Sequence, residues 1–215
     1  MRYQKIVMSP TDDIFVSRIG GLPLLETSDS WPLDPNTGRP LLLLATIQTG
    51  FLSDLFPQFA FADEHCISIF VCFDSSSRIC VRRLAIQEQS QIEKIGNEAS
   101  KVILHKRSRT PCDPPNNAPK PLAMLRMKLN SPADEESDPS MPDRGTIFSK
   151  VGGIPGWAQD PIDLPGYTYV LQISEHDIWR INPGHAGLLA NDTGFLFLRS
   201  LHEFGESGAF FIQFS

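Results

Sequence analysis

Two stretches of this chain repeat one another: Ser17-Arg18-Ile19-Gly20-Gly21-Leu22-Pro23 and, 132 residues later, Ser149-Lys150-Val151-Gly152-Gly153-Ile154-Pro155. Paired glycines permit positive φ angles or a very close approach of two backbones. The proline that follows cannot donate a backbone hydrogen bond, so a strand cannot continue through it. The repeat therefore predicts two sharp turns at sheet edges, one at Gly20, Gly21 and Pro23 and one at Gly152, Gly153 and Pro155.

The likeness continues beyond the turns. The apolar run Leu44–Ile47 is followed by a second apolar segment, and Val170–Ile173 likewise precedes Phe195–Leu198. A repeat of this length indicates the duplication of a domain rather than a solenoid. We expect an α+β fold, predominantly antiparallel β, with a tandem duplication of two similar halves packed around a shared core. The expected organisation is a single domain over residues 1–215, with a first half 1–106, a connecting region 107–145 and a second half 146–215.

Length and composition indicate a turn-rich globular protein. Of the 215 residues, 41% are hydrophobic and 20% are charged, and the chain holds 18 prolines and 15 glycines. The formal net charge of −6 disfavours nucleic acid or an anionic membrane surface as the main partner. Residues 1–13 contain no apolar signal segment, and even a long apolar run such as Leu41–Ala45 is far shorter than a membrane-spanning helix. We therefore expect a cytoplasmic protein.

The cysteines form no recognisable metal or redox motif. Cys66, Cys72, Cys80 and Cys112 contain no Cys-x-x-Cys pair and do not have the spacing of zinc ligands. In a reducing cytoplasm we expect all four to be free thiols.

The apolar patterns are mainly those of strands. Short runs rich in β-branched and aromatic residues, bounded by turn residues, predict strands over 40–48, 66–73, 124–129, 167–173, 195–198 and 209–214. Weaker strand candidates are 79–86 and 101–104. Helices are expected to be few and short, at 51–56, 87–98 and 175–179.

The connecting region 107–145 is rich in proline and in acidic residues. It holds 8 of the 18 prolines, and its residues 131–143 contain no Lys or Arg but five carboxylates, on Asp134, Glu135, Glu136, Asp138 and Asp143. Loops of this length are either functional or mobile. The sequence leaves two interpretations open, a solvated tether and a binding surface for a basic partner.

No pattern in the sequence indicates catalysis or metal binding. The run His202-Glu203-Phe204-Gly205-Glu206 matches the His-Glu-x-x-His zinc motif only at its first two positions, and Gly205 disfavours the helix that the motif requires. The polar group Glu175-His176-Asp177 is typical of a turn or a helix start, and no Gly-x-Ser-x-Gly elbow occurs. We therefore expect no enzymatic activity, no cofactor and no metal.

Several motifs together resemble the YwqG-like family of bacterial domains. They are the two Gly-Gly-x-Pro turns, Trp31-Pro32, Gly38-Arg39-Pro40-Leu41 leading into Leu44–Gln48, and then Gly156–Pro161, Val170–Ile173 and Gly194–Phe197. One departure is Ala45-Thr46-Ile47-Gln48, where the family favours Ala-Gln-Ile. The resemblance covers about residues 15–75 and 147–213. It implies an antiparallel α+β fold with a tandem duplication, no established enzymatic activity, and occurrence as candidate immunity proteins beside bacterial toxins.

On that resemblance we expect an immunity protein that binds and neutralises a cognate secreted toxin, a nuclease-type effector with a basic surface. Asp134, Glu135, Glu136 and Asp138 would occupy the cationic groove that a nuclease uses for phosphates, which mainly accelerates association. The alternative is a small-molecule or peptide-binding module with its site between the two halves, lined by Trp157, Trp179 and His176. An enzyme of unrecognised type is the third hypothesis.

Overall fold

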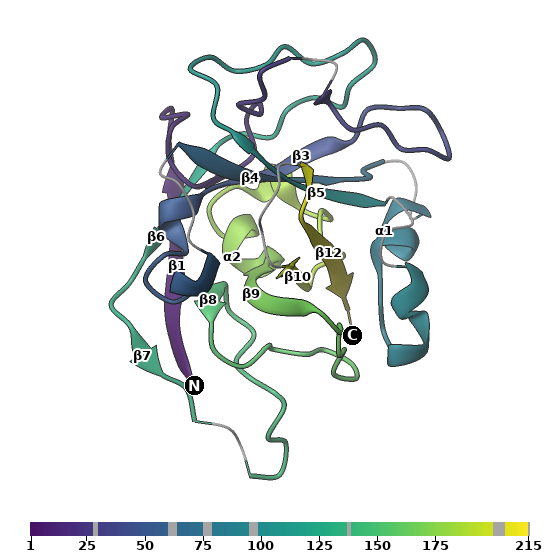
Figure 1. Ribbon diagram of the computed structural model, residues 1–215. Helices are drawn as coiled ribbons and strands as arrows, with labels where there is room; N and C mark the ends of the chain where they lie inside the picture. Colours follow the sequence, from purple (N-terminus) through teal and green to yellow (C-terminus); the bar gives the residue numbers. More distant parts are fainter. Residues whose placement is uncertain are drawn as a thin grey trace.

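The computed structural model describes residues 1–27, 30–59, 64–74, 79–94, 99–136, 139–199 and 205–214. Within these ranges, one mostly antiparallel sheet curls into a nearly closed barrel (Figure 1). Its strands are β1 (Arg2–Pro10), β2 (Arg18–Ile19), β3 (Leu42–Gln48), β4 (His65–Val71), β5 (Ser100–Lys106), β6 (Leu125–Leu129), β7 (Ala133–Asp134), β8 (Lys150–Gly152), β9 (Tyr167–Ser174), β10 (Thr193–Arg199), β11 (Gly205–Glu206) and β12 (Gly208–Gln213). The helical pieces are short: α1 (Ile79–Leu84), α2 (Glu175–Trp179) and the 3-10 turns η2 (Thr49–Phe51), η3 (Pro57–Phe59), η4 (Gln89–Lys94) and η5 (Pro183–His185).

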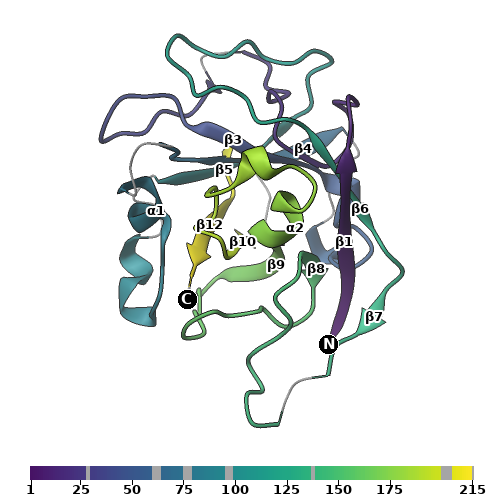
Figure 2. The ribbon, with the colours of Figure 1, turned by 180° about the vertical axis from the view of Figure 1, so that it is seen from behind.

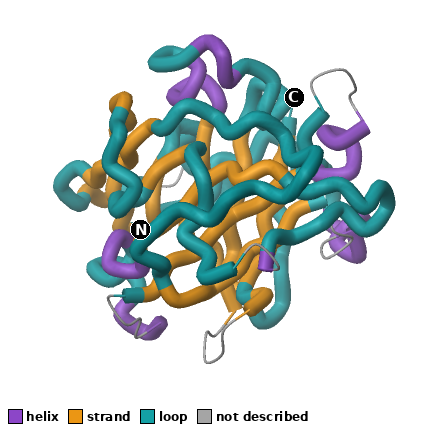
Figure 3. The backbone as a smooth tube through the Cα atoms, turned by 90° about the horizontal axis from the view of Figure 1, so that it is seen from above, coloured by secondary structure: helices purple, strands orange, loops and turns teal. Residues whose placement is uncertain are grey.

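The strands do not follow one another around the sheet in the order of the sequence. Their order is β11-β5-β4-β3-β2-β6-β1-β8-β9-β10-β12, and β7 pairs with β1 outside this path. The two ends of the sheet meet, because Ser207 donates its backbone N–H to the carbonyl of Val102 in β5 (2.9 Å). The hydroxyl of Ser100 in β5 also donates to the carbonyl of Phe210 in β12 (2.5 Å). In the view from above, strands occupy the middle of the molecule and the helical pieces lie towards its rim (Figure 3).

The expected α+β fold with two duplicated halves is wrong. The described residues contain only two short α-helices, and the sheet is continuous, so no boundary separates a first half from a second. The N-terminal strand β1 pairs on one side with β6 of the connecting region and on the other with β8. The late strand β11 returns to pair with β5. Strands from every part of the chain interleave because each strand must find hydrogen-bond partners for its backbone, and those partners are distant in sequence.

The two Gly-Gly turns are nevertheless alike in local geometry. Gly20, Gly21, Gly152 and Gly153 have φ angles of 73°, 78°, 69° and 76°, in the left-handed region that glycine adopts at little cost. A Cβ at Gly20 would lie 2.6 Å from the carbonyl oxygen of Ala123, so no side chain fits there. Contrary to expectation, the strands that end at these turns do not lie at sheet edges, because β2 lies between β3 and β6 and β8 lies between β1 and β9.

Most of the predicted strands are confirmed. β3 and β4 are buried along almost their whole length, as their continuous apolar runs predict. β1 is absent from the predicted strands, although its buried residues Gln4, Ile6 and Met8 alternate with exposed ones as in a half-buried strand. The weak strand predicted at 79–86 is wrong, because this segment forms α1 instead.

Candidate functional site

A groove of about 650 Å³ opens beside the N terminus, where the acidic part of the connecting region meets the turn that follows β8. Both the N terminus and β7 lie at this lower end of the molecule (Figure 2). The apolar residues Ile154, Trp157 and Ile162 line the groove together with three prolines, and the exposed carboxylates Asp143 and Asp163 also line it. We call this set of residues the acid-rimmed groove.

The carboxylate of Glu135 also lines the groove, and it is the best-anchored side chain there. Its Oε1 accepts hydrogen bonds from the Lys150 ammonium (2.6 Å), from the Thr146 backbone N–H (2.8 Å) and from the Thr146 hydroxyl (2.7 Å). Its Oε2 accepts from the Ile154 backbone N–H (2.8 Å). Glu135 thereby ties the acidic segment to the second Gly-Gly turn.

Burial and hydrogen bonding shift the pKa values of both members of this buried pair downward. Burial raises the pKa of the Glu135 carboxyl, but the hydrogen bonds from Lys150, Thr146 and Ile154 outweigh it, so the pKa lies below its usual range. Burial lowers the pKa of Lys150, and Glu135 offsets only part of that effect. Because the Lys150 side chain has no exposed surface, Glu135 is its essential counter-ion.

The predicted partner-binding residues do not share one environment. Asp134, in β7, and Glu136 are exposed to solvent, whereas Glu135 is buried and saturated with hydrogen bonds. Glu135 therefore supports the loop rather than presenting a charge to a partner. Asp138 lies outside the described residues.

Asp163 also lines the groove, although no sequence motif marks it. Asp163 follows Pro161 and Ile162 in an irregular segment, and Gln89 holds its backbone beside the groove. The Gln89 side chain donates to the Asp163 carbonyl and accepts from the Asp163 N–H (2.9 and 2.8 Å). No local sequence signal predicts this contact, since the two residues are 74 positions apart.

The floor of the groove rests on an aromatic cluster. The ring of Trp157 lies 4.6 Å from that of Phe195 and 6.4 Å from that of Phe211, measured between centroids. Ile162 and Ile86 belong to the same buried cluster. The apolar floor is consequently part of the packed core, which holds it in a single shape.

The alternative cleft predicted from Trp157, Trp179 and His176 is not assembled. Trp157 is buried in the aromatic cluster, whereas Trp179 lies on α2 and is 47% exposed. His176 is exposed on the same helix, 6.4 Å from Trp179 between ring centroids. Its neighbour Glu175 is buried and accepts backbone hydrogen bonds from Leu189 and Asn191, which agrees with a helix start rather than an acid–base group.

The Cys66 thiol in β4 and the His105 imidazole in β5 lie next to each other, and neither residue lines the acid-rimmed groove. The sulfur of Cys66 lies 3.5 Å from Nε2 of His105, and the Ser68 hydroxyl lies 2.9 Å from the same nitrogen. Burial raises the pKa of Cys66 to about 12 and lowers the pKa of His105. Both groups are therefore neutral at pH 7, so the thiol is not an activated nucleophile.

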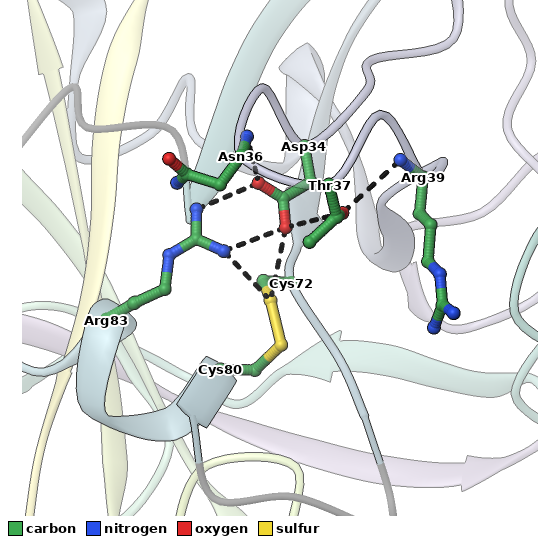
Figure 4. Close-up of a disulfide and its surroundings, with 7 residues drawn as sticks. All are labelled: Asp34, Asn36, Thr37, Arg39, Cys72, Cys80 and Arg83. Atoms are coloured by element: carbon green, nitrogen blue, oxygen red, sulfur yellow. Dashed lines mark hydrogen bonds and ion pairs between the residues drawn. A yellow bond between two sulfur atoms is a disulfide. The ribbon is translucent and has the colours of Figure 1, made fainter.

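The expectation of four free thiols is wrong for two of them. Cys72, just after β4, and Cys80, in α1, form a disulfide (Figure 4). Cys66 and Cys112 are free and buried. The two bonded cysteines are 8 residues apart with their Cα atoms 5.3 Å apart, a separation that a disulfide spans readily.

Among the residues that the structure describes, no group of three or more His, Cys, Asp or Glu side chains is placed to hold a metal ion. His202 and Glu203, the start of the partial zinc motif, lie outside those residues. No helix within the described ranges has the length and apolar character needed to cross a bilayer.

Comparison with known proteins adds no assignment. No protein-family model matches the chain, and no curated protein sequence matches it either.

Proposed function

We propose that this chain is an immunity protein that binds and neutralises a secreted bacterial toxin with a basic surface, of nuclease type. The acid-rimmed groove is the observation that carries the proposal, because it combines a rigid apolar floor with exposed carboxylates. The resemblance of the turn and strand motifs to the YwqG-like family supports the same class of protein.

A lysine or arginine of the partner fits the groove chemically. Its aliphatic stem can lie on the apolar floor at Ile154 and Ile162 while its charged head reaches Asp143 and Asp163. A volume of about 650 Å³ is larger than one such side chain needs, so the groove also has room for neighbouring residues of the partner. The groove would then supply the buried anchor that dominates the affinity of most protein interfaces.

Further carboxylates surround this anchor. Asp134 and Glu136 are exposed on either side of the buried Glu135 and leave their charges available to a partner. Charges at the rim of an interface mainly accelerate association and select the partner. We therefore propose that the acidic segment speeds the association of the partner and that the groove supplies most of the affinity.

We place the protein in the cytoplasm, where an immunity protein meets a toxin that has entered the cell. Disulfides are uncommon in that compartment and are often transient or redox-sensing when present. The Cys72–Cys80 bond is therefore of interest in its own right.

The proposal predicts a toxin gene beside the gene of this protein, and the experiment uses the product of that gene. Cells that express the toxin should survive only when this chain is co-expressed, and the two purified proteins should form a complex. The double substitution Asp143→Asn and Asp163→Asn removes two charges from groove residues whose side chains are exposed. We expect a roughly tenfold slower association at low salt and a weaker complex, with the difference shrinking as salt screens the charges.

The matched control is Asp12→Asn with Asp113→Asn. Both side chains are exposed, neither lines the groove, and the variant loses the same two charges. Death of the cells despite co-expression would refute the immunity function. Equal association rates for the groove variant and the control variant would refute the role of the groove.

A small molecule or peptide is the second candidate occupant of the same groove. The volume lies within the range of ligand pockets, about 300–1,000 Å³. The site does not lie between two halves, because the barrel has no such division. Binding of a short Lys- and Arg-rich peptide by the groove, without any complex with the neighbouring toxin, would favour this candidate.

A further inference from the structure

Helix α1 is fastened to the barrel by two links that lie side by side. One is the Cys72–Cys80 disulfide, which joins the residue after β4 to the second residue of α1. The other is a two-pronged ion pair, in which the Arg83 guanidinium donates to both carboxylate oxygens of Asp34 (2.8 and 2.9 Å). Figure 4 shows the two links converging.

The two links also touch each other. The sulfur of Cys72 lies 3.7 Å from Nη1 of Arg83 and 3.9 Å from Oδ2 of Asp34. Asp34 is buried and is held in place by the Asn36 backbone N–H (3.0 Å) and the Thr37 hydroxyl (3.0 Å). The guanidinium charge therefore faces the sulfur atom that would become a thiolate if the disulfide opened.

The segment that begins with α1 ends at the acid-rimmed groove. After α1, Ile86 donates its backbone N–H to the Ile212 carbonyl in β12 (3.0 Å) and packs into the aromatic cluster under the groove. Gln89 then holds the backbone of Asp163 with two hydrogen bonds. One continuous stretch, residues 79–94, thus carries the disulfide at one end and a support of the groove at the other.

We propose that the Cys72–Cys80 disulfide is a reversible redox clamp that a dithiol reductant opens, and that it controls the order of residues 79–94 and of the groove wall at Asp163. The biological meaning of a change in the groove rests on the proposed function. The opening of the disulfide and the loosening of residues 79–94 do not. The disulfide ties the start of α1 covalently to the end of β4. Because a cross-link restricts the conformational freedom of the segments that it joins, its reduction loosens the segment that α1 begins.

The chemistry is an ordinary thiol–disulfide exchange. A thiolate of the dithiol attacks the sulfur of Cys80, which is the more accessible of the two, and forms a mixed disulfide while Cys72 leaves as a thiolate. Arg83 can donate a hydrogen bond to that leaving sulfur from 3.7 Å, although its charge is shared with the Asp34 carboxylate. The second thiol of the reductant then attacks the mixed disulfide and releases Cys80. In total, two electrons and two protons pass to the cysteines, and the dithiol becomes a disulfide.

Amide hydrogen exchange of the whole protein tests the clamp without any partner. The oxidised protein is compared with protein treated with dithiothreitol under native conditions, and the number of free thiols is counted by mass after alkylation. We expect reduction without denaturant. We also expect exchange in residues 79–94 to become roughly tenfold to a hundredfold faster, a smaller acceleration at residues 160–164, and no change in β1, β8 and β9.

Two variants separate the clamp from the coupling. In Cys72→Ser with Cys80→Ser, the oxidised and the reduced samples should both show the fast exchange. In Gln89→Ala, residues 160–164 should exchange quickly in either redox state, while residues 79–94 still respond to reduction. Ser90→Ala is the matched control, since Ser90 is an exposed neighbour in η4, and it should behave as the unmodified protein does.

The outcomes are distinct. Absence of a disulfide in the oxidised protein, a requirement for denaturant, or unchanged exchange at residues 79–94 would overturn the clamp. Loosening of residues 79–94 without any change at 160–164 would overturn the coupling to the groove. Because no partner is present, none of these results depends on whether the groove binds a toxin.

Discussion

Replacing Glu135 by Gln is the most informative single perturbation, because the structure and the sequence assign this residue opposite roles. The sequence places Glu135 on a binding surface, whereas in the structure its side chain is 5% exposed and that of Lys150 is fully buried. The substitution leaves the Lys150 ammonium in the interior without a counter-ion. Breaking a buried pair in this way costs about 3–5 kcal/mol. We therefore expect a loss of this size in the free energy of unfolding.

The hydrogen-bond partners of Glu135 and Lys150 predict that substitutions of these two residues differ in their cost to stability. When Lys150→Met removes the cation, Glu135 still accepts from Thr146 and Ile154, so its charge remains solvated by hydrogen bonds. In Glu135→Gln, Lys150 keeps neutral acceptors only, which are the new amide oxygen and the Thr146 hydroxyl at 3.3 Å, and it loses its counter-ion. We expect Lys150→Met to cost less than Glu135→Gln, and the double variant to be more stable than Glu135→Gln alone.

Urea unfolding followed by tryptophan fluorescence measures these differences, with Glu136→Gln as the matched control. Glu136 is the exposed neighbour, and its substitution should change stability by less than about 0.5 kcal/mol. The pKa of Glu135 is lower in the folded protein than in the unfolded chain, where it is about 4.3. Its contribution is therefore complete above that unfolded value and is lost as the pH falls through the lower folded value. Equal stabilities of the Glu135 and Glu136 variants at pH 7 would refute the buried-pair interpretation.

Three further tests, two by pairs of substitutions and one by alkylation, address the local structure. Gly152→Ala should destabilise the protein by about 2–3 kcal/mol, because the φ of Gly152 is 69° and the new Cβ would lie 2.9 Å from a backbone oxygen. Gly38 has a similar φ of 66° but open space around it, so Gly38→Ala should cost only about 1 kcal/mol in the same urea assay. Trp157→Ala should lower the free energy of unfolding by about 3–5 kcal/mol, because it leaves a cavity in the aromatic cluster. Trp179→Ala, on the surface, should lower it by less than about 1 kcal/mol. Similar losses for the two variants would contradict the burial of Trp157. With its pKa raised to about 12, Cys66 should react with iodoacetamide at pH 8 about a thousandfold more slowly than a peptide thiol, and a reaction at the peptide rate would contradict this environment.

Local patterns in the sequence were sufficient for much of the secondary structure. Runs of β-branched and apolar residues located β3, β4, β9, β10 and β12 to within a few positions. The helical start at Glu175 was also recognised, because its polar residues follow an apolar strand. The interpretation of residues 79–86 as a strand failed, since Ile79 and Val81 favour a strand by type but the segment is held as a helix by the disulfide and by Arg83.

The sequence by itself determined the turns and most strands, because a positive φ at Gly20 or Gly152 and an apolar run depend on residues that are adjacent in the chain. Only the tertiary structure decided which strands pair, which of the clustered carboxylates is buried, and which distant residues complete the groove. Glu135 faces inward because Lys150 needs a counter-ion, and Asp163 reaches the groove because Gln89 holds its backbone. Such choices depend on charge compensation and hydrogen bonding between segments far apart in the chain, and the composition of each segment alone does not encode them.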